Sequence, residues 1–102
     1  SEAEIARVVA DAEGQKVADD RRRRAAELRL AIESLVYTSE RGLVEYASLL
    51  KQEDKDALTE SLKKARTTLQ GDAQLEALVA VPAALEGLAA KIGEAVYASA
   101  GG

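Results

Sequence analysis

The segment of residues 11–40, DAEGQKVADDRRRRAAELRLAIESLVYTSE, constrains the fold more strongly than any other part of the chain. It contains no proline and one glycine, and almost all of its residues are compatible with a helix. Its first part is polar all round, whereas its second half acquires an apolar stripe. A helix that is polar all round for several turns is not an ordinary core helix. The segment therefore predicts a helix that either crosses solvent or lies on something outside this chain.

The apolar residues indicate an all-α fold. They make up 47% of the chain, yet its only aromatic residues are Tyr37, Tyr46 and Tyr97. A core of this composition must consist of leucine, valine, isoleucine and alanine, which suits close-packed helices. The strand-like alternation of β-branched and aromatic residues does not occur. With 102 residues, the chain forms at most one domain with a modest core.

Composition and motifs argue against an enzyme. Neither histidine nor cysteine occurs, which removes the commonest general base, the commonest metal ligand and thiolate chemistry. The chain has no glycine-rich phosphate loop, no nucleophile with a plausible base and no metal-ligand cluster. We therefore expect no catalytic, cofactor-binding or metal-binding residue here, and a binding or structural module instead.

Charge and hydropathy restrict the partners. A net charge of −4 with both signs mixed argues against a nucleic-acid binder, which usually concentrates lysine and arginine. No apolar run approaches the roughly 20 residues of a membrane span, and we expect no signal peptide. We expect binding to neither nucleic acid nor membrane, and a cytoplasmic location. Since the chain does not begin with methionine, we also expect that it was excised from a longer protein, with processing of its N-terminus as the alternative.

The first residues predict a short helix with an apolar face. Ser1 followed by Glu4 reads as a capping box, which satisfies amide donors of the first turn. Gly14 weakens the helix by about 1 kcal/mol relative to alanine and predicts a break or a flexible joint, with fusion of the two helices into one rod as the alternative. The resulting helix of about three turns is too short to be stable alone. Its apolar face consists of Ile5, Val8, Val9 and Ala12.

A second, longer helix is predicted for residues 15–47. Asp19 and Asp20 lie four residues before Arg23 and Arg24, and each such pair stabilises a helix by about 0.2–0.5 kcal/mol. Four consecutive arginines splay around the whole helix. This arrangement favours a solvated, self-paired surface, and a basic docking site is the alternative.

Two further helices are predicted after a turn near residues 48–51. The first covers residues 52–70 and should end at Gly71 in a left-handed cap, with Asp72 capping the next helix. The last helix covers residues 73–99. Proline removes a backbone hydrogen bond and clashes with the preceding turn, so the last helix should kink or split near Val81, next to Pro82.

Three apolar stripes joined by short connections predict an antiparallel three-helix bundle over residues 28–99. The short first helix and the polar front of the long helix should project from it as an N-terminal arm over residues 1–27. A disordered tail is expected at residues 100–102. Gly14 and Gly42 are the candidate hinges.

The apolar face of the arm predicts an interaction surface. Ile5, Val8 and Val9 cannot reach the bundle core if the long helix carries them away from it, and an apolar face without a partner marks a binding site. The partner is either another domain of the parent protein or a second copy of this chain. The three tyrosines should pack at the bundle edge with their hydroxyl groups in water.

Several stretches in this order and spacing resemble one family: EIARVVADAE, ADDRRRR, AIESLVYTSERGL and LQGD. They resemble the C-terminal helical lid of DnaK-type 70-kDa heat-shock chaperones over essentially residues 1–95. The resemblance implies a lid that follows a β-sandwich domain and closes over the hydrophobic client peptides bound there. It also implies that ATP binds an upstream ATPase domain absent from this chain and thereby opens the lid.

The resemblance assigns roles to particular residues. Ile5, Val8 and Val9 match positions that pack on the β-sandwich. Glu33 falls where the family has an acidic latch residue that pairs with the rim of the peptide cleft. Tyr37 falls where well-studied bacterial members have a second latch residue, often histidine. A phenol donates a hydrogen bond but is not a cation near neutral pH, which puts the second latch contact in doubt.

A different class of function remains open beside the lid. The chain could be a self-associating structural or adaptor module that forms a homodimer through Ile5, Val8 and Val9. An adaptor that binds peptides itself is disfavoured, because the bundle stripes are used internally.

Overall fold

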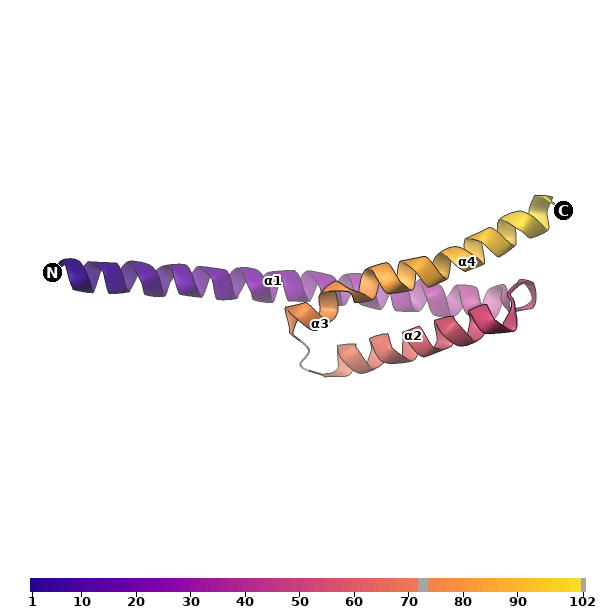
Figure 1. Cartoon of the computed structure of the whole chain (residues 1–102), viewed down its shortest axis with the longest axis horizontal. Helices are drawn as coiled ribbons and strands as arrows, with labels where there is room; N and C mark the ends of the chain where they lie inside the picture. The colour runs from indigo at the N-terminus through magenta and orange to yellow at the C-terminus, as the bar shows by residue number, and fades with distance from the viewer. Residues whose placement is uncertain (72–73, 102) are drawn as a thin grey trace.

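The computed structural model describes residues 1–71 and 74–101, and no strand occurs within these ranges (Figure 1). The all-α fold expected from the sequence is confirmed. The elements, in chain order, are α1 (Glu2–Glu45), the short 3₁₀ helix η1 (Ala47–Leu49), α2 (Gln52–Gln70), α3 (Leu75–Val79) and α4 (Val81–Gly101).

Helix α1 is a single helix of 44 residues, so the chain takes the fused alternative and has no break at Gly14. Ser1 caps it as expected, because its hydroxyl oxygen accepts a hydrogen bond from the Glu4 amide at 3.4 Å. One glycine costs a helix only about 1 kcal/mol, and the flanking residues are good helix formers. The two predicted N-terminal helices are therefore fused into one.

The molecule is elongated because α1 extends far beyond the other helices. Its principal extents are 76 × 26 × 17 Å. Figure 1 shows α2 running back along the C-terminal part of α1, and α3 and α4 returning in the direction of α1. The N-terminal part of α1 projects alone from this bundle.

The core consists mainly of leucine and isoleucine side chains, and all four α-helices contribute to it. The largest fully buried side chains are Ile32 of α1, Leu58 and Leu62 of α2, Leu78 of α3 and Leu85 of α4. Ala25 and Leu28 are half-buried residues of α1 that pack against this core. The contacts of α1 with the core thus begin by Ala25, and the boundary between arm and bundle at residues 27 and 28 stays a prediction.

The end of α2 differs from its prediction. Gly71 has φ −92° and ψ 176°, which is extended backbone, so the predicted left-handed cap is wrong. The Arg29 guanidinium of α1 instead donates hydrogen bonds to the carbonyl oxygens of Leu69 at 3.0 Å and Gly71 at 3.1 Å. A tertiary contact therefore satisfies carbonyl groups that a local turn was expected to satisfy. The capping residue predicted next, Asp72, lies outside the described residues.

The split predicted beside Pro82 is confirmed. Helix α3 ends at Val79, and α4 begins at Val81. Pro82 thus lies in the first turn of α4, where its missing amide hydrogen removes no intrahelical bond. At the other end, α4 continues through Gly101, so the tail predicted as disordered is helical at residues 100 and 101; Gly102 lies outside the described residues.

The two hinge candidates have different surroundings inside α1. A Cβ atom on Gly42 would lie 3.1 Å from Cδ1 and 3.6 Å from Cγ2 of Ile92, so the glycine allows α4 to approach α1 closely. A Cβ atom on Gly14 would meet nothing within 4 Å. Packing against Ile92 therefore explains why a glycine stands at position 42, whereas no contact explains the glycine at position 14. A hinge at Gly14 or Gly42 remains a prediction.

One buried polar side chain, that of Ser39, is expected to lower the stability of the protein. Ser39 is 2% exposed, and its hydroxyl oxygen has no hydrogen-bond partner among the described residues. An unpaired buried hydroxyl costs about 1–3 kcal/mol, and alanine is the better helix former. We expect Ser39→Ala to raise the free energy of unfolding by about 1 kcal/mol, measured by urea denaturation. The control Ser34→Ala on the exposed side should change it by about 0.5 kcal/mol or less; a loss of stability in Ser39→Ala would refute the assignment.

Candidate docking surface

The apolar face predicted near the start of α1 is exposed to solvent. Ile5 is 64%, Val8 67% and Val9 50% exposed, and Ala12 is also exposed. These four residues, called the N-terminal face below, lie on the part of α1 that projects from the bundle (Figure 1). Exposure of three large aliphatic side chains within five residues is the property of a contact surface.

A second exposed apolar group lies further along α1, beside the bundle. Leu30 is 67%, Tyr37 65% and Val44 80% exposed, and these three residues form what we call the distal patch. Sequence reasoning identified Tyr37 but missed Leu30 and Val44. Each of the two lies seven residues from Tyr37, on a side of the helix away from the stripe of Ile32 and Val36, and this spacing is the signal that could have found them.

The N-terminal face and the distal patch lie on the same side of α1. Each residue turns an α-helix by about 100°. On this basis six side chains fall within an arc of about 60°: Ile5, Val8, Ala12, Leu30, Tyr37 and Val44. The buried residues of α1, which are Ile32, Val36 and Ser39, lie on the opposite side. One side of α1 therefore holds the bundle together, and the other presents apolar groups to solvent.

The two latch candidates lie on the exposed side of α1. Glu33 and Tyr37 are four residues apart, and both are exposed. Each directly follows a buried core residue, Ile32 or Val36, so neither side chain contributes to the core. Glu33 has no hydrogen-bond or ion-pair partner in the part of the chain that the structure describes. Both residues are available for a partner, and a latch role remains a prediction.

The arginine run is paired mainly along the helix, with a spacing that differs from the prediction. Arg22 pairs with Asp19, and Arg23 lies 3.7 Å from Asp20, so both pairs span three residues instead of four. Arg21 forms an ion pair with Glu76 of α3 and thereby joins α1 to α3. This contact between elements was not foreseen.

The Arg21–Glu76 contact affects the protonation of the carboxyl group. The pKa of Glu76 lies below its ordinary value of 4.5, first because Arg21 donates a hydrogen bond to it and second because its own backbone amide does so. Since the folded-state pKa is lowered, the pair is intact at neutral pH and is lost as the pH falls through that lowered pKa. Glu76 is exposed, so the pair orients α3 more than it stabilises it.

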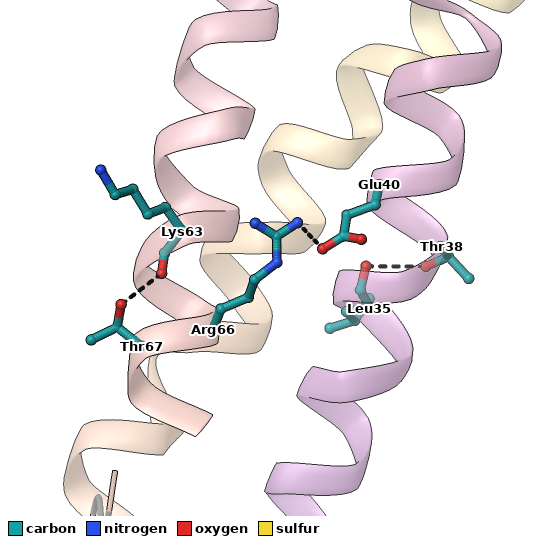
Figure 2. Close-up of polar contacts among 6 residues, drawn as sticks. All are labelled: Leu35, Thr38, Glu40, Lys63, Arg66 and Thr67. Carbon is teal, nitrogen blue, oxygen red and sulfur yellow. Dashed lines mark hydrogen bonds and ion pairs between the residues drawn. The ribbon is translucent and has the colours of Figure 1, made fainter. Parts of the chain in front are cut away.

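A second ion pair joins α1 and α2. Figure 2 shows Arg66 of α2 directed toward Glu40 of α1, and the two form an ion pair. Beside it, the hydroxyl of Thr38 donates to the carbonyl oxygen of Leu35 at 3.2 Å, and that of Thr67 donates to Lys63 at 3.0 Å (Figure 2). These contacts are exposed and link neighbouring turns or helices, as in a solvated bundle surface.

The described residues offer no metal site and no membrane span. No group of three or more acidic, histidine or cysteine residues in ranges 1–71 and 74–101 is arranged to hold a metal ion. Within the same ranges, no helix is both long and apolar enough to cross a membrane.

The chain is an all-α bundle with an exposed apolar side on a projecting helix. The family model of the Hsp70 proteins matches residues 1–98, and the chain therefore belongs to the Hsp70 family. The resemblance to DnaK-type chaperones found in the sequence is thus confirmed. One curated relative is the chaperone protein DnaK of Anaplasma marginale, which is 30% identical over 100 residues.

The match covers a small part of that relative. It includes 97% of this chain but only 16% of the length of DnaK. No solved structure matches the chain. The chain thus corresponds to one region of a chaperone of the Hsp70 family.

Proposed function

We propose that this chain is the helical lid of a chaperone, and that it slows the release of hydrophobic client peptides from an adjacent β-sandwich domain. The observation that carries the proposal is the N-terminal face: Ile5 and Val8 are about two-thirds exposed on a helix of an Hsp70-family chain. A β-sandwich that covered this face would remove its apolar surface from water. The lid itself needs no catalytic residue, and ATP would act on it through a separate ATPase domain.

In the proposed mechanism, the N-terminal face anchors α1 and the bundle blocks the peptide cleft. Glu33 and Tyr37 form the latch on the same helix. The ion pair of Arg21 with Glu76 and the half-buried Ala25 connect the anchoring part of α1 to the bundle, so the two move together. Opening then requires the loss of contacts between α1 and the β-sandwich, without unfolding of the bundle core.

The test is the rate of peptide release from the full-length parent protein. Val8→Glu places a charge in the anchoring contact, and burial of an unpaired charge is costly. We expect the dissociation rate of a fluorescent peptide, measured without ATP, to rise at least about tenfold. Val17→Glu is the matched control, because Val17 is 58% exposed but lies about 180° around α1 from Val8. Equal rates for wild type and Val8→Glu would overturn the lid function.

The same exposed face favours a second candidate function, self-association. Without a covering domain, Ile5, Val8 and Val9 could pack against a second copy, which would give a homodimer. Light scattering over a concentration series of this chain tests it. A dimer that Val8→Glu abolishes supports self-association, and a monomer at all concentrations rules it out.

A further inference from the structure

The arginine run of α1 is not explained by the bundle core or by the lid function. Residues 16–29 contain six basic and three acidic residues and thus carry a net charge of +3, although the whole chain carries −4. Arg21 pairs with Glu76, and Arg22 pairs with Asp19. Both ion pairs are exposed, and exposed pairs contribute little to stability. The segment therefore has an excess of positive charge, and its pairs can exchange for the carboxylates of a partner.

Two of these arginines line a groove between α1 and α3, at the end of the bundle from which α1 projects (Figure 1). This arginine groove has a volume of about 520 Å³. It is lined by four residues of α1 and by two residues at the start of α3: Ala18, Arg21, Arg22, Ala25, Gln74 and Leu75. The side chains of Arg21 and Arg22 are 47% and 76% exposed, so both guanidinium groups are accessible.

The lining of the arginine groove indicates the chemistry of its partner. A guanidinium group presents a planar set of donors that matches a carboxylate. The alanines and Leu75 add apolar surface beside the two guanidinium groups. None of the described residues of the lining is aromatic, so the groove lacks the platform on which the bases of a single-stranded nucleic acid stack. This combination of positive charge and aliphatic surface is complementary to an acidic peptide segment that also carries apolar side chains.

The arginine groove and the N-terminal face lie on different sides of α1. At about 100° per residue, the α1 residues of the groove centre about 140° around the helix from the N-terminal face. They lie on the same side of α1 as the buried Ile32 and Val36. A body that rests on the N-terminal face therefore approaches α1 from another side and leaves the groove open. The partner that fits the groove is accordingly a separate protein.

We propose that the arginine groove docks an acidic segment of a second protein. A carboxylate of that segment binds the guanidinium groups of Arg21 and Arg22, and a neighbouring apolar side chain packs against Leu75. Glu76 is an internal competitor, because its own carboxylate pairs with Arg21. This docking site goes beyond the lid function and does not require a β-sandwich domain.

Fluorescence anisotropy of this chain with a labelled peptide, Glu-Leu-Glu-Glu-Leu-Glu, tests the proposal. Arg22→Ala should weaken binding about fivefold or more, because it removes a charge-assisted contact. Ala18→Leu should weaken it about fivefold as well, since the larger side chain fills part of the groove without a change of charge. Glu76→Gln should tighten binding about twofold, because it releases Arg21. Raising the salt from about 0.05 M to about 0.5 M should weaken it about tenfold.

Arg23→Ala is the matched control. Arg23 lies 3.7 Å from Asp20 and thus has the same pairing along the helix as Arg22 has with Asp19. It lies about 150° around α1 from the centre of the arginine groove. The dissociation constant should therefore stay within about twofold of wild type. Because all substituted side chains are exposed, circular dichroism should show an unchanged helical content in every variant.

Three results would overturn the proposal. One is the absence of binding up to about 1 mM peptide. Another is an equal affinity of wild type, Arg22→Ala and Ala18→Leu, or equally tight binding of a peptide with lysines in place of the glutamates. The third is tighter binding of an oligothymidylate of the same length, which would assign the arginines to a nucleic acid. Since these measurements use this chain alone, the lid function, which Val8→Glu tests in the parent protein, stands or fails separately.

Discussion

Leu85→Ala is expected to lower the free energy of unfolding of the bundle by about 3 kcal/mol. Leu85 is fully buried on α4 and belongs to the core cluster that joins this helix to α1 and α2. Truncation removes apolar contacts and leaves a cavity, because the surrounding helices relax only partly. A small domain has a total stability of about 5–15 kcal/mol, so this single change removes a large fraction of it.

Urea denaturation followed by circular dichroism measures this effect. Leu30→Ala is the matched control, since it is the same substitution at a position that is 67% exposed on α1. We expect the control to change the free energy of unfolding by about 0.5 kcal/mol or less. If both substitutions cost the same, the packing of α4 described here is incorrect.

Arg29→Leu should lower the free energy of unfolding by about 2 kcal/mol, which is the second-largest effect expected. The guanidinium group donates to the carbonyl oxygens of Leu69 and Gly71, at a helix end where no left-handed cap satisfies them. Hydrogen bonds to a charged donor contribute about 1.5–3 kcal/mol, and a cation is favourable at a helix C-terminus. Loss of Arg29 also removes two hydrogen bonds that link the end of α2 to α1.

Two variants separate the geometry of Arg29 from its charge. Arg29→Lys should recover only part of the loss, because an ammonium group does not reproduce the planar fork that reaches both carbonyl groups. Arg66→Ala, which removes the exposed ion pair with Glu40, should cost less than about 1 kcal/mol. Thermal unfolding of the three variants under one condition compares them directly. A loss for Arg66→Ala as large as that for Arg29→Leu would contradict the role given to Arg29.

Local signals predicted the ends of some helices well. The range predicted for the helix after the turn, residues 52–70, coincides with the observed α2, whose first turn carries Glu53 and Asp54. Pro82 marked the boundary between α3 and α4 because proline acts through its own backbone. In both cases the cause lies within a few residues of the effect, so the sequence is sufficient to find it.

Effects that depend on distant residues were missed. Gly14 suggested a joint because its own cost was counted without the good helix formers on both sides. Gly71 suggested a left-handed cap, although Arg29, which is 42 residues away, satisfies the carbonyl groups. The pairing of Arg21 with Glu76 likewise depends on how α3 folds back. For the candidate site, the N-terminal face was found in full, whereas Leu30 and Val44 were hidden beside the stronger core stripe.

The unbroken length of α1 has a mechanical consequence. Its 44 residues make a rod of about 66 Å, which turns a small rotation at one end into a large displacement at the other. A tilt of about 10° at the N-terminus would move the far end by roughly 11 Å, about the diameter of a helix. The bundle attached to α1 would move along this arc as a rigid body together with the helix. The force that swings it needs to act only on the first few turns, where α1 projects alone.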